Sequence, residues 1–209
     1  MIKSFIRRRR FLLFGFVLLL VLGCTSSPPT RFYTLSSLQE GGGELRGSPS
    51  DQDLAIGVGP IKFPEYLDRA EIVTRSSSNK ITLSHFDLWA GSLAEDFNQV
   101  LAENLSVLLS TENVIVYPRL RPGLAKYQIT MDVIRFDGSL GGDVSLIVRW
   151  AILEGKERKT VSVRKSTIIE PSGPQGYEAM VAANSRALEK LSREIAEAIR
   201  TLAKGSSSP

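Results

Sequence analysis

The feature that most constrains this sequence is an apolar run, Phe11 to Leu22, that ends one residue before the chain's single cysteine, Cys24. Four arginines, Arg7 to Arg10, precede the run. A basic segment, a short apolar segment and a small residue at the cut site are typical of a secretory signal peptide. The run has twelve residues, whereas a helix needs roughly 20 to span a bilayer. We therefore predict that residues 1–23 are a signal peptide and that Cys24 faces outward.

The residues Val21–Cys24 resemble the lipobox of bacterial lipoproteins. In such proteins the thiol of the new N-terminal cysteine accepts a diacylglycerol, and a small residue before it, here Gly23, gives the signal peptidase access. Three acyl chains on Cys24 would make release from the membrane negligible, because two membrane signals already anchor a protein stably. Two alternatives stay open: an ordinary signal peptide with a chance cysteine, and a cytosolic protein with a buried cysteine.

The basic charge of the chain belongs to the segment predicted to be removed. The full chain has a formal net charge of +4, and residues 1–23 carry five positive charges and no acid, so the mature chain has a net charge of −1. This balance gives no support for binding of nucleic acid or anionic lipid. The remaining 186 residues suit one domain. With Cys24 acylated no thiol remains, which excludes disulfides and thiol redox chemistry.

The first half of the mature chain reads as a tether followed by short strands. Residues 24–31 are predicted to be the acylated N-terminus and tether. A strand-like stretch at 31–35 begins seven residues after Cys24, at most about 25 Å away along the chain, so we expect the domain to lie close to its membrane. Residues 39–53 are Gly-rich and polar, which predicts a flexible loop. Further strands are predicted at 54–61, 71–75 and 81–86.

From Asp87 the pattern changes to a helical period, and apolar residues from Leu93 to Leu109 form one stripe. Alternating stretches joined by short turns then predict an antiparallel meander, with strands at 114–117, 127–133, 144–153 and 160–169. A second amphipathic helix is predicted over 177–202, and residues 204–209 are expected to fray. The order of elements predicts an α+β fold, a two-layer sandwich with a mixed, mostly antiparallel sheet and two long helices on one face.

The sequence offers no recognisable catalytic or metal site. His85 is the single histidine; one histidine without a free cysteine cannot build a His-ligated zinc site, and His85 is expected at a surface or sheet edge. No G-x-S-x-G motif occurs. Asp132 falls on the polar face of its strand and Asp137 is expected to begin a turn. We therefore predict a protein that is not an enzyme and has no cofactor or metal.

Two other sequence features have structural explanations. Gly57 and Gly59 lack the third glycine and the following helix that a phosphate-binding loop needs, so close backbone packing or a bulge is expected there. Trp89, expected at the start of the first helix, and Trp150 are predicted core residues. No basic patch with interleaved aromatic residues indicates nucleic-acid binding.

Several short motifs recur in one known family, and the match runs through the last helix. They are Phe32–Leu35, Ile56–Ile61, Pro64–Arg69, Ile72–Arg75, Trp89–Ala90 with Leu93, and Val100–Leu105. These stretches resemble the PqiC-type ABC-transport auxiliary lipoproteins. The resemblance implies a single domain over 32–203, with the more specific motifs in its first half. The Gly-rich segment at 39–53 is longer than is usual in that family.

The resemblance implies a role in transport between membranes. Such lipoproteins accompany MCE-type (mammalian-cell-entry domain) systems of Gram-negative bacteria, which carry lipids or other hydrophobic molecules across the periplasm. The implied partners are an MCE-domain protein, its inner-membrane permease and the outer membrane, reached through the acyl chains; self-association stays open. Thr25 follows Cys24 where an aspartate would signal inner-membrane retention in enterobacteria, which agrees with an outer-membrane address on the periplasmic face.

A permanent anchor without an active site suits a docking subunit that holds the distal end of a conduit at the outer membrane. The candidate docking residues are Pro60, Pro64, Tyr66, Leu67, Asp68, Arg69 and Trp89. Most of these residues lie in a predicted turn from Pro60 to Arg69. The alternative is that this turn has no docking role, with Tyr66 and Leu67 packed inward. The competing function is a lipoprotein that activates or assembles another envelope machine, such as a cell-wall synthase.

Overall fold

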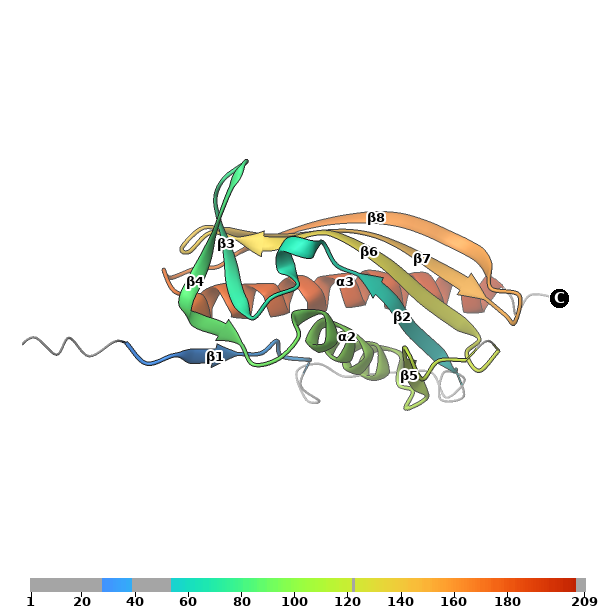
Figure 1. Ribbon diagram of the computed structural model, residues 1–209. Coiled ribbons are helices and arrows are strands. Elements are labelled where there is room, and N and C mark those ends of the chain that lie inside the picture. The colour runs from blue at the N-terminus through green and yellow to red at the C-terminus, as the bar shows by residue number, and fades with distance from the viewer. Residues whose placement is uncertain (1–27, 39–53, 122, 206–209) are drawn as a thin grey trace, which may run out of the picture.

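The computed structural model describes residues 28–38, 54–121 and 123–205. The predicted signal peptide, Cys24 and the predicted loop at 39–53 lie outside these ranges. In the part of the chain that is described, no helix is long and apolar enough to cross a membrane. The described residues form one eight-stranded sheet and two long helices, so the predicted α+β class is confirmed (Figure 1).

The sheet is mixed, as predicted. Its order runs β1-β4-β3-β6-β2-β5, and β7 and β8 extend it from the long strand β6. β1 pairs in parallel with β4, and β2 pairs in parallel with both β5 and β6. The other extended pairings, β3 with β4, β6 with β7 and β7 with β8, are antiparallel. The bounds are β1 Arg31–Tyr33, β2 Ile56–Lys62, β3 Glu71–Ser77, β4 Lys80–Trp89, β5 Val114–Val116, β6 Tyr127–Gly138, β7 Asp143–Glu154 and β8 Lys159–Pro171.

The strands β6, β7 and β8 form the antiparallel meander that the short turns predict. The inclusion of the strand at 114–117 was wrong, because β5 pairs in parallel with β2 at the other edge of the sheet. Alternate residues of β7, including Leu146, Val148 and Trp150, are fully buried, while their neighbours along the strand are partly or fully exposed. This alternation places one face of the meander in the core, because successive side chains of a strand point to opposite faces. Trp150 and Trp89 are both buried, as predicted.

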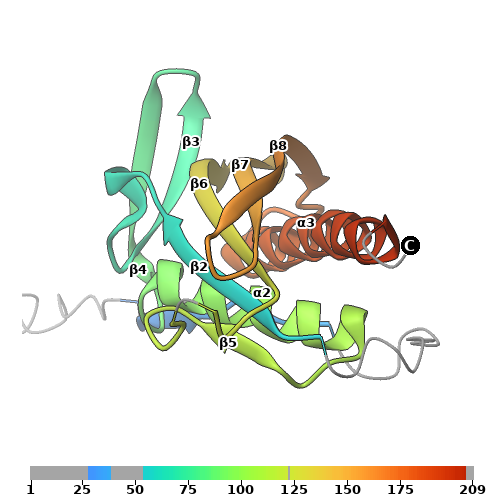
Figure 2. The ribbon, with the colours of Figure 1, turned by 90° about the vertical axis from the view of Figure 1, so that its right-hand side faces the viewer.

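Two helices pack against the sheet and against each other. Helix α2 (Leu93–Leu109) contacts β2 and β5, and helix α3 (Tyr177–Gly205) contacts β6, β7 and β8 (Figures 1 and 2). Between the two helices, the buried amide of Asn104 donates a hydrogen bond to Ser192 Oγ at 3.1 Å. Helix α3 reaches Gly205, so Lys204 and Gly205 still belong to the helix although the sequence predicts a fraying tail from residue 204.

The predicted start of the first helix was wrong. The pattern suggests a helical period from Asp87, but β4 continues through Trp89 and α2 begins at Leu93. Ser92 is the N-cap, and its Oγ accepts a hydrogen bond from the Glu95 amide. The strand is irregular before its end, where Ser84 Oγ accepts the Asp87 amide at 2.9 Å. This local bond disturbs the alternation that a regular strand would show.

The glycines of β2 have the structural role that the sequence predicts. A Cβ at Gly57 would lie 2.6 Å from a terminal methyl carbon of Leu120, so any larger residue would require the Leu120 side chain to move. Gly59 has a φ of +100°, a conformation that glycine adopts without strain. The register of β2 against β6 shifts between Val58 and Ile61. Close packing and an irregular pairing therefore explain the two glycines.

Candidate docking surface

The predicted docking turn is a short 3-10 helix, η2 (Glu65–Leu67), that follows β2. Its backbone closes on itself, because the Leu67 amide donates to the Pro64 carbonyl at 2.9 Å and the Asp68 amide to the Glu65 carbonyl at 3.1 Å. Pro64 and Pro60 are half-buried, whereas Asp68 and Arg69 are exposed. The exposed charges at the end of η2 are therefore the part of this turn most accessible to a partner.

Two of the predicted docking residues face inward. The side chain of Leu67 is 4% exposed and that of Trp89 is 6% exposed, and both belong to the hydrophobic core. The Trp89 amide nevertheless donates to the Ala70 carbonyl at 2.7 Å, so the end of β4 lies directly beside the residue that follows the turn. Trp89 and Leu67 are thus core residues next to the turn, and their side chains offer little surface to a partner.

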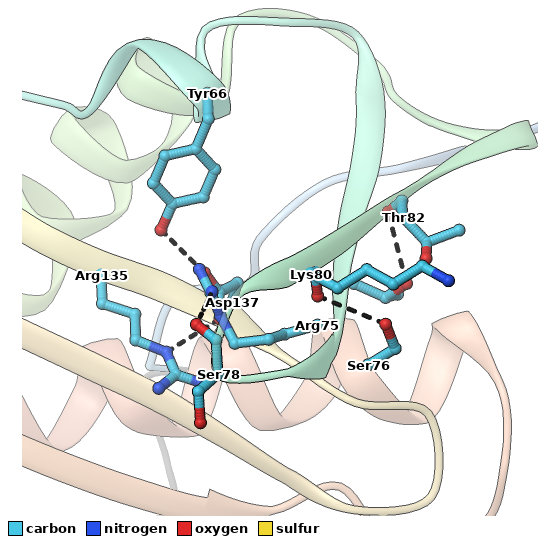
Figure 3. Close-up of polar contacts among 9 residues, drawn as sticks. Tyr66, Arg75, Ser76, Ser78, Lys80, Thr82, Arg135 and Asp137 are labelled. Atoms are coloured by element: carbon cyan, nitrogen blue, oxygen red, sulfur yellow. Dashed lines mark hydrogen bonds and ion pairs between the residues drawn. The ribbon is translucent and has the colours of Figure 1, made fainter.

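Tyr66 contributes to a buried polar cluster around Asp137 (Figure 3). The Tyr66 hydroxyl donates to Asp137 Oδ2 at 2.7 Å, and Arg75 donates to both carboxylate oxygens, at 2.9 Å and 2.8 Å. Arg135 donates a further bond to Oδ1 at 2.9 Å. The Arg75 guanidinium also lies 5.8 Å from the centre of the Tyr66 ring. We call Tyr66, Arg75, Arg135 and Asp137 the Asp137 cluster; it joins η2, β3 and β6.

The electrostatics of the cluster fix its protonation states. Burial raises the pKa of the Tyr66 phenol to about 12, and the hydrogen bond to Asp137 adds to the rise. Burial would raise the pKa of Asp137 too, but the hydrogen bonds from Arg75, Tyr66 and Arg135 outweigh it and hold that pKa below its usual value. At neutral pH a neutral phenol and two guanidinium groups therefore surround an ionised carboxylate. This arrangement suits positioning of η2, since no member is poised to exchange a proton.

The sequence did not reveal this cluster. Asp137 was expected to begin a turn, but it lies within β6 and its side chain is completely buried, so that expectation was wrong. Its partners Tyr66 and Arg75 are 71 and 62 residues away along the chain. The available signal was a charged residue inside an otherwise alternating strand, which requires a partner when buried.

A shallow hollow lies beside the docking turn. Pro60 and Lys62 of β2, Asp132 of β6, Arg149 of β7 and Val163 of β8 contribute to its lining, and its volume is about 270 Å³. These strands pack α3 and α2 through their buried residues, so the exposed Val163, Asp132 and Arg149 belong to the opposite sheet face. The hollow combines apolar side chains, among them Pro60 and Val163, with charges of both signs at its margin, a composition found at protein contacts.

A larger groove of about 680 Å³ lies between α2 and β5. Three glutamates, Glu95, Glu103 and Glu112, contribute to its lining, together with Arg119. Among the described residues, no group of three or more histidine, cysteine or acidic side chains is arranged to hold a metal ion. His85 is exposed on β4, as expected.

The strand nearest to Cys24 is attached through a second buried carboxylate. Asp87 of β4 receives an ion pair from Arg31 Nε at 2.8 Å and hydrogen bonds from Tyr33 Oη at 2.9 Å and Ser84 Oγ at 3.0 Å. Burial opposes ionisation, but these donors outweigh it and lower the pKa of Asp87. Asp87 therefore fixes β1, and with it the start of the tether, to the body of the domain.

Comparison with known proteins supports one family. Residues 33–196 match the sequence model of the family described as ABC-type transport auxiliary lipoprotein component. The intermembrane transport lipoprotein PqiC of Escherichia coli (strain K12) is 24% identical over 182 residues, which cover 86% of this chain and 92% of that protein. The crystal structure of a Xanthomonas campestris protein has the same fold, with a TM-score of 0.68 and 17% identity over 86% of this chain and all of the other. A second crystal structure, of an uncharacterized protein, aligns with a TM-score of 0.66 and 20% identity over 82% of this chain and 99% of the other.

Proposed function

Because the chain belongs to the family of ABC-type transport auxiliary lipoprotein components, we propose that it is the non-catalytic lipoprotein subunit of an intermembrane transport system. The observation that carries the proposal is the family match over residues 33–196, which spans nearly the whole described domain. The relative named as an intermembrane transport lipoprotein, aligned over most of both chains, supports the same role. The cargo would be lipids or other hydrophobic molecules that cross the periplasm.

In this proposal Cys24 carries the acyl chains that hold the protein at the periplasmic face of the outer membrane. Thr25, in place of an aspartate, supports that address. The partners would be an MCE-domain protein, which forms the conduit, and its inner-membrane permease. The protein would contribute the fixed end of the conduit, which requires a stable anchor and a rigid contact surface.

The contact surface we propose is formed by η2 and the hollow beside it. Both helices would cover one face of the sheet as the second layer of a two-layer sandwich, leaving the face with Val163 open to a partner. The exposed Asp68 and Arg69 lie at the end of η2, and the Asp137 cluster holds that turn to the sheet. Mixed charges around an apolar centre favour specific docking, since complementary charge contributes to partner choice and orientation.

Co-purification from solubilised membranes tests the function and the surface together. The acylated protein is purified, and the proteins that accompany it are identified by mass spectrometry. We expect an MCE-domain protein in the wild-type sample, and we expect the double variant Asp68→Lys, Arg69→Glu to recover much less of it. Glu197→Lys, an exposed charge reversal on α3, is the matched control and should recover as much as wild type.

Two results would contradict these proposals in different ways. Recovery of cell-wall synthases in place of an MCE-domain protein would refute the transport function. Recovery of the MCE-domain protein in equal amounts by the double variant and the wild type would refute only the docking surface.

A further inference from the structure

We propose that the edge of the domain formed by β1 and β4 rests on the lipid bilayer, with Phe32 and Phe86 as its contact residues. The inference rests on the acylation of Cys24 in the proposed function, and it adds a direct contact between the folded domain and lipid. Phe32 is 64% exposed and Phe86 is 37% exposed, although both are large apolar side chains. Exposed aromatic residues close to an anchor are typical of proteins that bind at the membrane interface.

The backbone of β1 holds Phe32 in a fixed place. Phe32 pairs in register with Leu88 of β4, and the Ala90 amide donates to the Tyr33 carbonyl at 2.8 Å. The chain immediately after β1 is attached to helix α2, since the Leu35 amide donates to Asp96 Oδ2 at 2.7 Å. Phe32 is therefore a surface residue of the folded domain although it follows closely on the predicted tether.

Alternation along β1 directs Phe32 away from the core. Arg31 and Tyr33 both reach the buried Asp87, which places them on one face of the strand. Phe32 must then lie on the opposite face, together with its register partner Leu88. Leu88 is half-buried and Phe86, two residues earlier on β4, is 37% exposed, so both strands of this edge present apolar side chains to the surroundings. The surface ends at β3, where Glu71 stands opposite Leu88.

The length of the chain from Cys24 identifies lipid as the occupant of this surface. Eight residue steps separate Cys24 from Phe32, so the side chain can lie no more than about 26–29 Å from the acylated residue. Residues 25–31 contain no acid and one base, Arg31, so the connecting chain carries no charge that would oppose approach to a bilayer. A membrane surface is therefore always within reach of Phe32.

The position of the surface also distinguishes it from the exposed side chain of Val163. Val163 is 70% exposed, but it belongs to the first half of β8, close to the turn that joins β7 and β8. That turn lies at the opposite end of the molecule from β1 (Figure 1). Helix α3 begins near β1 and ends at that far end (Figure 1). Because the acyl chains already supply the affinity, contact through Phe32 would set orientation, with α3 extending from the bilayer into the periplasm.

Tryptophan fluorescence in vesicles containing brominated lipids tests the contact. The acylated Phe32→Trp protein is reconstituted into phosphatidylcholine vesicles whose acyl chains carry bromine, a contact quencher of tryptophan. The matched control is Val163→Trp, which places the same reporter on an exposed strand position far from the anchor. The native Trp89 and Trp150 are buried and give the same background in every sample. Circular dichroism of each variant checks that the fold is kept, and Phe86→Trp serves as a second reporter.

We expect emission from Trp at position 32 to shift to shorter wavelength and to lose intensity with brominated lipid, while emission from position 163 stays unchanged. Equal quenching at positions 32 and 163 would overturn the inference. A second result would also overturn the inference: emission from position 32 that is quenched neither by aqueous iodide nor by brominated lipid. The surface would then be covered by a second copy of the chain and not by the bilayer. Mass spectrometry that finds Cys24 unacylated would instead overturn the anchoring that the proposed function requires, and this inference with it.

Discussion

Replacing Asp137 with asparagine should destabilise the domain without changing the shape of the side chain. In the wild type the carboxylate receives four hydrogen bonds, two from Arg75, one from Arg135 and one from Tyr66. Asparagine keeps one carbonyl oxygen, but its NH2 group would replace Oδ2, which accepts from Arg75 Nη2 and Tyr66 Oη; an NH2 group cannot accept these bonds, and the side chain carries no charge. Asp137→Asn therefore leaves two buried or partly buried cations without their counterion.

The structure limits the size of the effect. Removing one partner of a buried ion pair typically costs about 3–5 kcal/mol. The side chain of Asp137 is fully buried, but Arg75 keeps 19% and Arg135 33% of its side-chain surface exposed, so water can partly replace the lost contacts. We therefore expect a loss of about 2–4 kcal/mol in the free energy of unfolding. In a domain of this size that loss corresponds to a decrease in Tm of about 6–12 °C.

Urea unfolding followed by circular dichroism measures the loss, with Asp132→Asn as the matched control. Asp132 is an exposed aspartate on the same strand, so its replacement should change stability by less than about 0.5 kcal/mol. The pKa of Asp137 lies below its usual value, so its contribution is present above about pH 4 and is lost as the pH falls through the folded-state value. The free energies of unfolding of Asp137→Asn and Asp132→Asn should therefore become equal at low pH. Equal stabilities of Asp137→Asn and Asp132→Asn at pH 7 would refute the reasoning.

Three further predictions concern other parts of the domain. Because the pKa of Tyr66 is raised to about 12, the native state favours the neutral phenol, and the free energy of unfolding should fall as the pH rises from about 10 to about 12. Tyr66→Phe should remove this part of the alkaline decline, and an identical pH profile in urea titrations would contradict the assignment. Ser92→Ala removes the N-cap of α2, whose hydrogen bond is long at 3.4 Å. Thermal melts should therefore show a modest decrease of about 0.5–1 kcal/mol in the free energy of unfolding, and a larger decrease would contradict a role limited to helix capping. Asp87→Asn should loosen β1, which hydrogen exchange would detect as faster exchange of the Tyr33 and Leu35 amides with β7 unchanged, and protection equal to wild type would count against that role.

The sequence pattern predicts the regular elements of this fold well, for a physical reason. The meander from Tyr127 and the long final helix bury one face each, so their apolar residues recur at the period of the structure. The boundary between β4 and α2 was missed because Ser84 bonds the Asp87 backbone and breaks the strand alternation. A side chain that bonds its own backbone a few residues on disturbs such a pattern locally.

The candidate site was predictable only in part. The residues Asp68 and Arg69 are exposed as a docking turn requires, but no local pattern could show that Tyr66 donates to a carboxylate on β6. Contacts of this kind depend on the sheet order, in which β6 lies between β3 and β2 although β4, α2 and β5 separate it from both in the chain. A parallel pairing with a long crossover leaves no periodic trace in the sequence.

The two buried aspartates have the same structural role, and this links stability to function. Each holds a peripheral element of three residues, η2 for Asp137 and β1 for Asp87, that is too short to be fixed by its own backbone bonds. A carboxylate that accepts three or more directed bonds admits few orientations, so it fixes the element as well as attaching it. These elements form the proposed partner surface and the proposed membrane contact. A domain of typical stability would tolerate the loss of either carboxylate and stay folded at 25 °C. We therefore expect Asp137→Asn to recover less of the partner protein, and Asp87→Asn to lose contact with the bilayer. Circular dichroism should still report the native fold for both variants.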